Sequence, residues 1–331
     1  MKNKIKLSII ISAFNVDKYI EKCINSCFQQ SLDTHSFEVL VIDDGSTDKT
    51  VELSNQFNNS HNNFRIIRQL NSGLGSTRNS GIENAKGTYL WFLDGDDYLE
   101  KEILNEILLK IEKNDLDVLA LNYKIVDNNY KILDEKTSIF KIDREYVSGP
   151  EFYRDNYELN YTWLFIFKKD IFIKNSLKFE EKINMQDSEI FPKIMKFTSK
   201  VSVMDKHCYY YVQHDNSYTN IKNPEKRFNY FKSLVIVKKS LENTLCNCDD
   251  KDLKIGLEKK LDILHKIVFN HLVFNHFDNR WFKESILLLN KNNLYPIKFK
   301  PKYKLLPILW GLNSFPYLTK FIIDNILLRE K

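Results

Sequence analysis

Glycine and proline are scarce in this sequence, with 9 and 7 among its 331 residues. Both dominate flexible linkers and low-complexity segments, so their scarcity excludes a chain built largely of such segments. No apolar run approaches the roughly 20 residues that a transmembrane helix needs, and we expect no such helix. Lys2, Lys4 and Lys6 precede the apolar run 7–11 in the manner of a signal peptide. No cleavage site of small residues follows, so we interpret the run as a strand.

Cysteine is also rare. The five cysteines are odd in number and lack the spacing of a disulfide framework, and neither they nor the seven histidines show the spacing of a metal site. Unpaired thiols are typical of the reducing cytosol, which predicts a cytoplasmic protein. Cys23 and Cys27 share the apolar face of a predicted helix, and we expect both in the core.

The composition provides for a large core, because 43% of the residues are hydrophobic and 28% are charged. Apolar runs alternate with segments of helical spacing, beginning with a helix at 16–30 capped by Asn15. This alternation predicts an α/β fold with a mainly parallel central sheet flanked by helices. Residues 124–160 are predicted to be irregular, a helix follows from 186, and the pattern is helical from about 225 onward. The predicted strands are residues 6–14, 38–42, 64–67, 88–93, 117–123 and 200–212, and residues 161–172 are predicted to form a strand and a turn.

Two of the predicted strands end in acidic turns. Asp43 and Asp44 follow one strand, and Asp94, Asp96 and Asp97 follow the central one. Ligands of α/β sheets bind beyond the carboxyl ends of the strands. Three close carboxylates repel one another, so one pKa would rise unless a cation such as Mg²⁺ or Mn²⁺ neutralises them. The alternative is a solvated turn that caps the next helix, but the second acidic strand end favours a ligand site.

Four motifs within residues 1–100 together resemble the nucleotide-binding half of the family 2 glycosyltransferases, which have the GT-A fold. Any one of them is weak by itself, whereas their order and spacing together are specific. The motifs are Ser12-Ala13-Phe14-Asn15, Asp43-Asp44-Gly45-Ser46-Thr47-Asp48, Asn71-Ser72-Gly73 with Arg78-Asn79, and Asp94-Gly95-Asp96-Asp97.

The resemblance continues less surely to about residue 217 and fades in the helical region. It implies a GT-A domain over residues 1–220, with a nucleotide-binding half at 1–100 and an acceptor half at 101–220. A helical C-terminal region, a candidate for membrane association, follows at 221–331.

The resemblance implies a site for a nucleotide-sugar donor, usually a UDP-sugar. Ser12, Phe14 and Asn15 stand where the family holds the base, and Asp44 resembles the acid that hydrogen-bonds the base. Arg78 stands where the family has a basic residue near the nucleotide. The alternative for Arg78 is a helix surface position with a solvated guanidinium.

The resemblance implies a separate role for each of the three acidic residues in the turn after the central strand. Asp94 resembles the acid near the ribose, and Asp96 resembles the ligand that holds Mn²⁺ or Mg²⁺ on the diphosphate. Asp97 supports Asp96 without itself binding the metal ion. His214 follows the segment where many relatives are basic, and it either faces the diphosphate or lies at the surface.

On the acceptor side, Asp187 stands where the family has its catalytic base, and its alternative is a helix N-cap. The family commonly has Glu before this Asp, whereas this chain has Gln186, which either weakens the base or leaves Glu189 to substitute in part. Many relatives also have Lys two residues after the Trp that corresponds to Trp163, where this chain has Phe165. These departures concern the acceptor side and leave the donor motifs intact.

The resemblance therefore implies an inverting, metal-dependent glycosyltransferase that acts on a glycan or a lipid-linked oligosaccharide. Bacterial surface polysaccharide synthesis, such as that of capsule, O-antigen or lipooligosaccharide, is the implied setting. Two rivals remain: a catalytically degenerate scaffold that binds nucleotide or glycan, and a sugar nucleotidyltransferase. A sugar nucleotidyltransferase usually needs a glycine-rich, basic triphosphate loop near the N-terminus, which this sequence lacks.

The net charge of +5 is concentrated near the C-terminus, where residues 281–331 contain nine Lys and Arg against three Asp and Glu. Lysines interleaved with Trp, Tyr and Leu suit the surface of an anionic membrane, which would place the protein on the inner face of the cytoplasmic membrane. The alternative is a basic helical pair packed on the core. Nothing else in the sequence resembles a nucleic-acid recognition motif, so we expect no nucleic-acid partner.

Overall fold

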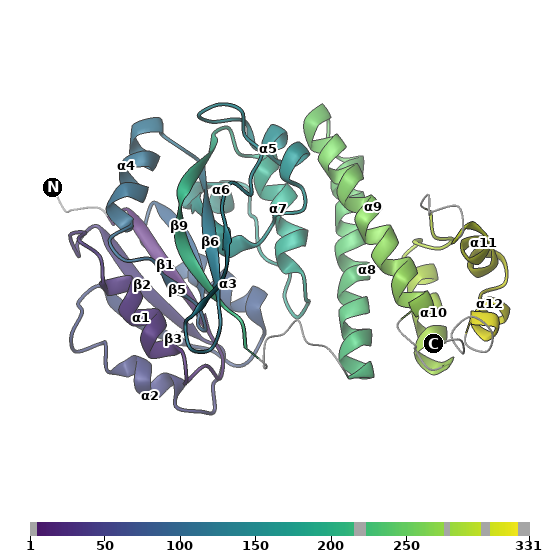
Figure 1. Ribbon diagram of the computed structural model, residues 1–331, viewed down its shortest axis with the longest axis horizontal. Coiled ribbons are helices and arrows are strands. Elements are labelled where there is room, and N and C mark those ends of the chain that lie inside the picture. The colour runs from purple at the N-terminus through teal and green to yellow at the C-terminus, as the bar shows by residue number, and fades with distance from the viewer. Residues whose placement is uncertain (1–4, 215–222, 275–278, 299–304, 324–331) are drawn as a thin grey trace. The chain divides into compact units, whose positions relative to one another are not determined.

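A computed structural model describes residues 5–214, 223–274, 279–298 and 305–323. The chain divides into two compact units, and Figure 1 labels most of their helices and strands. The first unit comprises Met1–Lys182, Gln186–Ser217 and Asp250–Leu253, and the second comprises Ile183–Met185, Tyr218–Asp249 and Lys254–Lys331.

The first unit begins with four parallel strands in the order β3-β2-β1-β4. Every residue of β1 and β2 is buried, because both faces of these strands are apolar and covered. The strands predicted at these positions are confirmed. The strands are β1 (Leu7–Ala13), β2 (Phe37–Asp43), β3 (Phe64–Arg68) and β4 (Tyr89–Asp94), and the helices among them are α1 (Ile20–Phe28), α2 (Thr50–Asn55) and α3 (Leu74–Asn84).

Beyond β4 the sheet is mixed. The next strand, β8 (Phe165–Lys168), is antiparallel to both β4 and β6 (Val118–Val126). Then β9 (Val201–Val212) runs parallel to β6 and antiparallel to the short β5 (Tyr98–Leu99). The mainly parallel pairing expected from the sequence thus holds for the first four strands, because an apolar run does not encode the direction of its neighbour.

The stretch 124–160 is not irregular, contrary to the prediction. It contains the end of β6, then β7 (Ile132–Lys136), which pairs with β6, and α5 (Gly149–Asn156). Ser148 caps α5 by accepting a hydrogen bond from Glu151 N, and a proline follows at the start of the helix. Both are ordinary helix start signals, which the polar composition of the stretch obscured. The remaining elements of this unit are α4 (Leu104–Asn114), the short 3-10 helix η1 (Thr162–Leu164), α6 (Lys169–Lys174) and α7 (Gln186–Lys196).

The second unit is helical, as predicted for residues from about 225. Its helices are α8 (Pro224–Cys246), α9 (Lys251–Phe274), α10 (Asn279–Lys291), α11 (Leu306–Ser314) and α12 (Pro316–Ile322), with the first residues of α9 counted in the first unit. In the part of the chain that the structure describes, none of the helices is long and apolar enough to cross a membrane. Residues 299–304 and 324–331 of the predicted membrane-facing tail lie outside the described residues.

The cysteines agree with their sequence interpretation. Cys23 and Cys27 are buried on α1, and none of the five cysteines, all of which lie in the described part of the chain, forms a disulfide. Burial raises the pKa of Cys27 to about 12, so this thiol is an inert part of the core.

Candidate active site

The register of the parallel strands brings their acidic ends to one edge of the sheet. Ala13 at the end of β1 lies opposite Asp43 on β2, and Ser12 lies opposite Asp94 on β4. The carboxyl ends of β2 and β4 therefore flank the end of β1. This is the edge at which ligands bind in sheets of this kind.

Asp44 is buried and holds the loop that opens α3. Its Oδ1 accepts hydrogen bonds from Ser72 N and Gln69 Nε2, both at 2.9 Å, and its Oδ2 accepts one from Gly73 N at 2.8 Å. Gly73 has φ +88°, a conformation that favours glycine. The carboxylate thus fixes the start of α3 relative to the end of β2.

The end of β1 is joined to the loop after β2 through Asn15. This residue has φ +52°; its N donates to Ser46 Oγ at 3.0 Å, and its Oδ1 accepts from Thr47 N at 2.9 Å. Because α1 begins only at Ile20, Asn15 is not the N-cap expected for it. Beside it, the ring of Phe14 is 47% exposed at the strand end.

Arg78 on α3 is buried, with an exposed fraction of 1%, so the surface alternative for this residue is wrong. Its guanidinium forms a hydrogen-bonded ion pair with Asp187 and lies 3.4 Å from Asp94 Oδ1. Burial alone would lower the pKa of Arg78, but the two carboxylates raise it above its ordinary value. One buried cation thus connects the acid at the end of β4 with the predicted base on α7.

The helix that carries Arg78 is docked closely on the segment before α7. The side-chain amide of Asn79 donates to Phe179 O at 2.9 Å and accepts from Phe179 N at 2.8 Å. One turn earlier, a Cβ on Gly75 would lie 2.3 Å from the backbone oxygen of Glu180. The Asn79 position of the motif therefore sets the distance between donor-side and acceptor-side residues.

Asp94 and Asp97 lie in different surroundings although only three positions separate them in the chain. Burial, together with the charges of Asp96 and Asp187, raises the pKa of Asp94 to about 6 against the attraction of Arg78. Asp97 is buried; its Oδ2 accepts from Tyr209 Oη at 2.6 Å, and its Oδ1 accepts from Val212 N at 2.7 Å. Asp97 thus fastens the acidic turn to β9.

Asp96 is half-buried in this turn, and its partner is His214. Nε2 of His214 lies 2.9 Å from Asp96 Oδ2, and its side chain is only 9% exposed, so the surface alternative for His214 is wrong. Two neighbouring ligands of an octahedral ion with bonds of about 2.1 Å lie about 3 Å apart, so this pair fits one Mg²⁺ or Mn²⁺ ion. Among the described residues no group of three or more His, Cys, Asp or Glu side chains fits a metal ion. Two protein ligands are nevertheless enough where substrate phosphates complete the shell.

Asp187 is the second residue of α7 and not its N-cap, since the helix begins at Gln186. Its Oδ1 accepts hydrogen bonds from Arg78 and, at 2.5 Å, from the Thr162 hydroxyl. Among the described residues its Oδ2 has only a long contact, 3.4 Å, with Thr162 N. Glu189 is buried and ion-paired with Lys193 of the same helix.

Sequence reasoning missed two residues that complete the site. Thr162 holds the carboxylate of Asp187, and Tyr209 holds that of Asp97. The available signals were weak: Thr162 precedes the Trp163 position of the family, and Tyr209 begins a run of three tyrosines. The sequence places both residues in a predicted strand or turn. Neither position, however, indicates which distant residue the side chain contacts.

The sequence is similar to those of known proteins. The family model described as glycosyl transferase family 2 matches residues 8–178. The uncharacterised glycosyltransferase EpsJ of Bacillus subtilis is 28% identical over 219 residues, which are 65% of this chain and 63% of that protein. The poly(ribitol-phosphate) beta-N-acetylglucosaminyltransferase TarS of Staphylococcus aureus is 30% identical over 210 residues, 62% of this chain and 35% of that protein. The matched region is thus less than two thirds of either relative.

Solved structures agree in fold. The crystal structure of S. aureus TarS 1–349 in complex with UDP-GlcNAc has a TM-score of 0.72 at 23% identity, covering 99% of this chain and 93% of that one. A mannosyltransferase from Pyrobaculum calidifontis in complex with GDP-Man and Mn²⁺ has a TM-score of 0.55 at 14% identity, covering 98% and 88%. These likenesses confirm the predicted GT-A fold.

Proposed function

The chain belongs to glycosyl transferase family 2, and on this premise we propose that it is an inverting, metal-dependent glycosyltransferase. It moves a sugar from a nucleotide donor, a UDP-sugar, to a hydroxyl group of a glycan or a lipid-linked oligosaccharide. The Asp94–Arg78–Asp187 bridge carries the proposal. It joins an acid at the donor edge of the sheet to an acid suited to deprotonate an acceptor, with a buried cation between them.

The donor lies against the carboxyl ends of β1, β2 and β4 in this proposal. The exposed ring of Phe14 offers a stacking surface for the base, next to Ser12 and Asn15, and Asp44 lies beside them. Asp94 accepts from the ribose hydroxyls, and Asp97 acts as a positioning residue through Tyr209. The similarity to TarS, which binds UDP-GlcNAc and UDP, supports a uridine nucleotide.

Asp96 and His214 are the residues that would hold Mn²⁺ or Mg²⁺ together with the diphosphate oxygens. The ion would supply positive charge where negative charge develops on the leaving diphosphate. The Mn²⁺ bound with GDP-Man in the Pyrobaculum enzyme supports this assignment.

Asp187 acts as the general base through Oδ2, because its Oδ1 is already occupied by Arg78 and Thr162. The acceptor hydroxyl oxygen attacks the anomeric carbon, its proton passes to Oδ2, and the bond from that carbon to the diphosphate oxygen breaks. A single displacement inverts the anomeric centre, so an α-linked donor gives a β-linked product. Arg78 and Thr162 hold the carboxylate in position while the proton moves.

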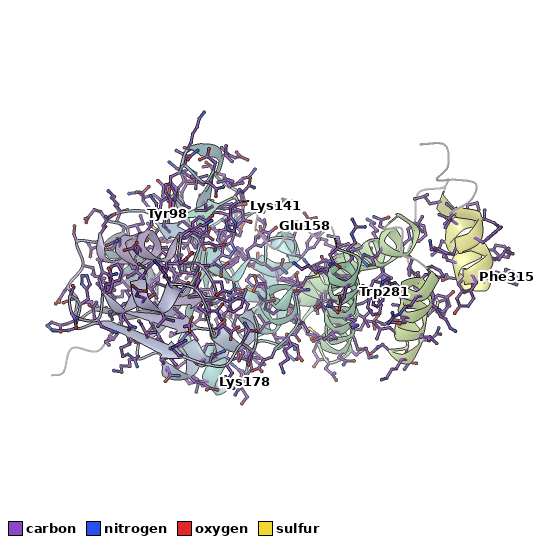
Figure 2. All side chains as sticks on the ribbon, turned by 90° about the horizontal axis from the view of Figure 1, so that it is seen from below. Tyr98, Lys141, Glu158, Lys178, Trp281 and Phe315 are labelled. Carbon is purple, nitrogen blue, oxygen red and sulfur yellow. The ribbon has the colours of Figure 1, made fainter. Side chains whose placement is uncertain are left out.

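The setting that we propose is the synthesis of a bacterial surface polysaccharide such as capsule, O-antigen or lipooligosaccharide, at the cytoplasmic face of the membrane. The relative TarS, named for poly(ribitol-phosphate), supports a surface polymer. A contact with anionic lipid is supported by exposed aromatic residues on the last two helices. Phe315 lies at the junction of α11 and α12 with its side chain on the outside of that pair, as Figure 2 shows.

A thermal-shift panel tests the donor site, with UDP, GDP, CMP and ADP each added with and without Mn²⁺. A nucleotide present at about 100 times its dissociation constant stabilises the protein by roughly 2.7 kcal/mol. We expect a shift with UDP that requires Mn²⁺, followed by release of UDP and not pyrophosphate when a UDP-sugar turns over. Absence of a shift with every nucleotide would overturn the donor site. A UDP shift with no transfer to any acceptor would favour the degenerate scaffold, and pyrophosphate release would favour a nucleotidyltransferase.

A further inference from the structure

A stack of aromatic rings reaches from the acidic turn to the surface beside the predicted base. Tyr209 and Tyr211 are alternate residues of β9, so their side chains share one face of the strand. The Trp163 ring stacks on both, with centroids 4.5 and 5.7 Å away and interplanar angles of 23° and 2°. The Tyr161 ring lies on Trp163 at 5.6 Å and 22°.

The inner end of this stack belongs to the donor side. Tyr209 is buried; its hydroxyl donates to Asp97 and accepts a 3.3 Å hydrogen bond from Asp94 N. Trp163 is also fixed to the central strand, since its backbone oxygen accepts from Trp91 Nε1 at 3.0 Å. The stack is thus built on the same β4 and β9 segments that position the acidic turn.

The outer end of the stack adjoins the acceptor side. Thr162 lies between Tyr161 and Trp163 in the chain and donates both its hydroxyl and its N–H to Asp187. The Tyr161 backbone is fixed as well, because its oxygen accepts from Leu164 N at 2.9 Å. Tyr161 is therefore a rigidly held ring, one residue from the side chain that orients the base.

Burial distinguishes Tyr161 from the rest of the stack. Trp163 is 7% exposed, whereas Tyr161 is 46% exposed. A ring needed only to complete the core would be expected to be covered on both sides. A single exposed aromatic residue is common on protein surfaces, but Tyr161 is exposed at the end of a stack that leads to the acidic turn, and it adjoins the residue that orients Asp187.

We propose that the Tyr161 ring stacks against the sugar ring of the acceptor, the one whose hydroxyl Asp187 deprotonates. The C–H face of a pyranose is apolar and carries partial positive charge, which suits the negative face of an aromatic ring. An acceptor recognised in this way ends in a cyclic sugar and is not a linear alditol phosphate. The inference rests on the proposed function and adds to it the class of the acceptor.

Saturation-transfer NMR tests the stack without turnover. The probes are the methyl pyranosides of glucose, galactose and N-acetylglucosamine, with ribitol 5-phosphate as the linear comparison, in the presence of UDP and Mn²⁺. We expect transfer to the ring C–H protons of at least one pyranoside in the wild type, strong loss in Tyr161→Ala and retention in Tyr161→Phe. Tyr146→Ala is the matched control, because Tyr146 is 41% exposed and takes no part in the stack.

With the pyranoside that binds as acceptor, kinetics give a second measure. Loss of the packing of one aromatic ring should raise the acceptor KM about ten- to a hundredfold in Tyr161→Ala, with little change in kcat. The UDP thermal shift and the melting temperature should stay near the wild-type values. If Tyr161 had only a structural role, Tyr161→Ala would lower the melting temperature and kcat and would not selectively change the acceptor KM.

Three outcomes would overturn the proposal: equal pyranoside signals in the wild type and Tyr161→Ala, no signal from any pyranoside, or a signal from ribitol 5-phosphate alone. Failure of the proposed function is recognised separately, by the absence of a UDP shift. An intact UDP shift with a pyranoside signal that does not depend on Tyr161 rejects the stacking alone.

Discussion

Arg78 on α3 and Asp187 on α7 form a hydrogen-bonded ion pair although 109 positions separate them in the chain. The guanidinium also lies 5.4 Å from the ring of Phe179 and 6.0 Å from that of Phe92. A cation in such apolar surroundings depends on its two carboxylate partners, and the carboxylates depend on it. The buried charge of Arg78 is therefore fully paired only when Asp94 on the donor side and Asp187 on the acceptor side are both in place.

Replacing Arg78 tests this balance. Arg78→Met leaves Asp94 and Asp187 without their shared cation, and we expect a loss of about 3–5 kcal/mol in the free energy of unfolding, measured with urea. Arg78→Lys keeps the charge, but one ammonium group does not reach both acids with the geometry of a guanidinium, so an intermediate loss is expected. Equal stability of Arg78→Met and the wild type would contradict the assignment of a buried, balanced cation.

Asp187→Asn separates donor binding from transfer. The amide oxygen still accepts from Arg78 and Thr162, so the fold and the UDP thermal shift should be retained. Loss of a general base should lower kcat about 10²- to 10⁴-fold. Glu189→Gln is the control for the neighbouring acid, and we expect it to keep most of the activity, because Glu189 is paired with Lys193. If Asp187→Asn transfers sugar at the wild-type rate, the base is another residue.

The Asp96–His214 pair gives a prediction on the metal. Asp96→Ala and His214→Ala should each remove the part of the UDP thermal shift that requires Mn²⁺ and abolish metal-dependent turnover. His35→Ala is the control, since His35 is exposed and lies outside the site. Retained wild-type activity in Asp96→Ala would refute the metal assignment.

The sequence predicted the elements of the sheet because its buried strands are continuous apolar runs, such as Leu7–Ala13 and Phe37–Asp43. It did not predict that β8 runs antiparallel to β4, since strand direction depends on partners elsewhere in the chain. The sequence predicted acidic strand ends at Asp43 and Asp94, and the register places both at one edge of the sheet.

The contacts within the site were harder to predict. The burial of Arg78 follows from the docking of α3 by Asn79 and Gly75, which are local signals for a distant contact. His214 and Thr162 acquire partners only when β9 and η1 come beside the acidic turn and α7. No pattern in the sequence around these two residues indicates those partners.

His271 on α9 predicts a pH dependence of stability. It is buried against the Phe231 ring, and burial together with the charge of Arg227 lowers its pKa to about 4. Unfolded histidine titrates near pH 6.5, so the unfolded chain binds a proton that the folded chain does not. The folded state therefore loses stability as the pH falls from about 6.5 towards about 4, and this one group accounts for a loss of about 2 kcal/mol at pH 5.

Comparison with His271→Gln isolates that contribution. The difference in unfolding free energy between about pH 7 and about pH 5 should be smaller in this variant by about 2 kcal/mol. His35→Gln serves as the exposed control and should leave the difference unchanged. An identical pH dependence of the wild type and His271→Gln would contradict a neutral, buried His271.

The surface of α11 and α12 predicts binding to anionic lipid. Trp310 is 67% exposed and lies 6.1 Å from the Phe315 ring, and Leu318 and Phe321 are exposed on α12. A Cβ on Gly311 would lie 2.6 Å from Thr319 Oγ1, so the two helices are closely packed and present these residues on a fixed surface. Aromatic side chains combined with a surplus of Lys and Arg in residues 281–331 favour a lipid headgroup region over a purely apolar partner.

Vesicle sedimentation tests this surface. We expect binding to vesicles that contain phosphatidylglycerol, weaker binding to pure phosphatidylcholine, and a blue shift of the tryptophan fluorescence on binding. The double variant Trp310→Ser, Phe321→Ser should lose most of the binding, whereas Leu109→Ser, at an exposed leucine of α4, should not. Salt should weaken the interaction, because lysines near a charged surface each contribute about 1 kcal/mol that is screened beyond a Debye length. Self-association of the wild type that the double variant abolishes, without any vesicle binding, would instead identify this surface as a contact between copies of the chain.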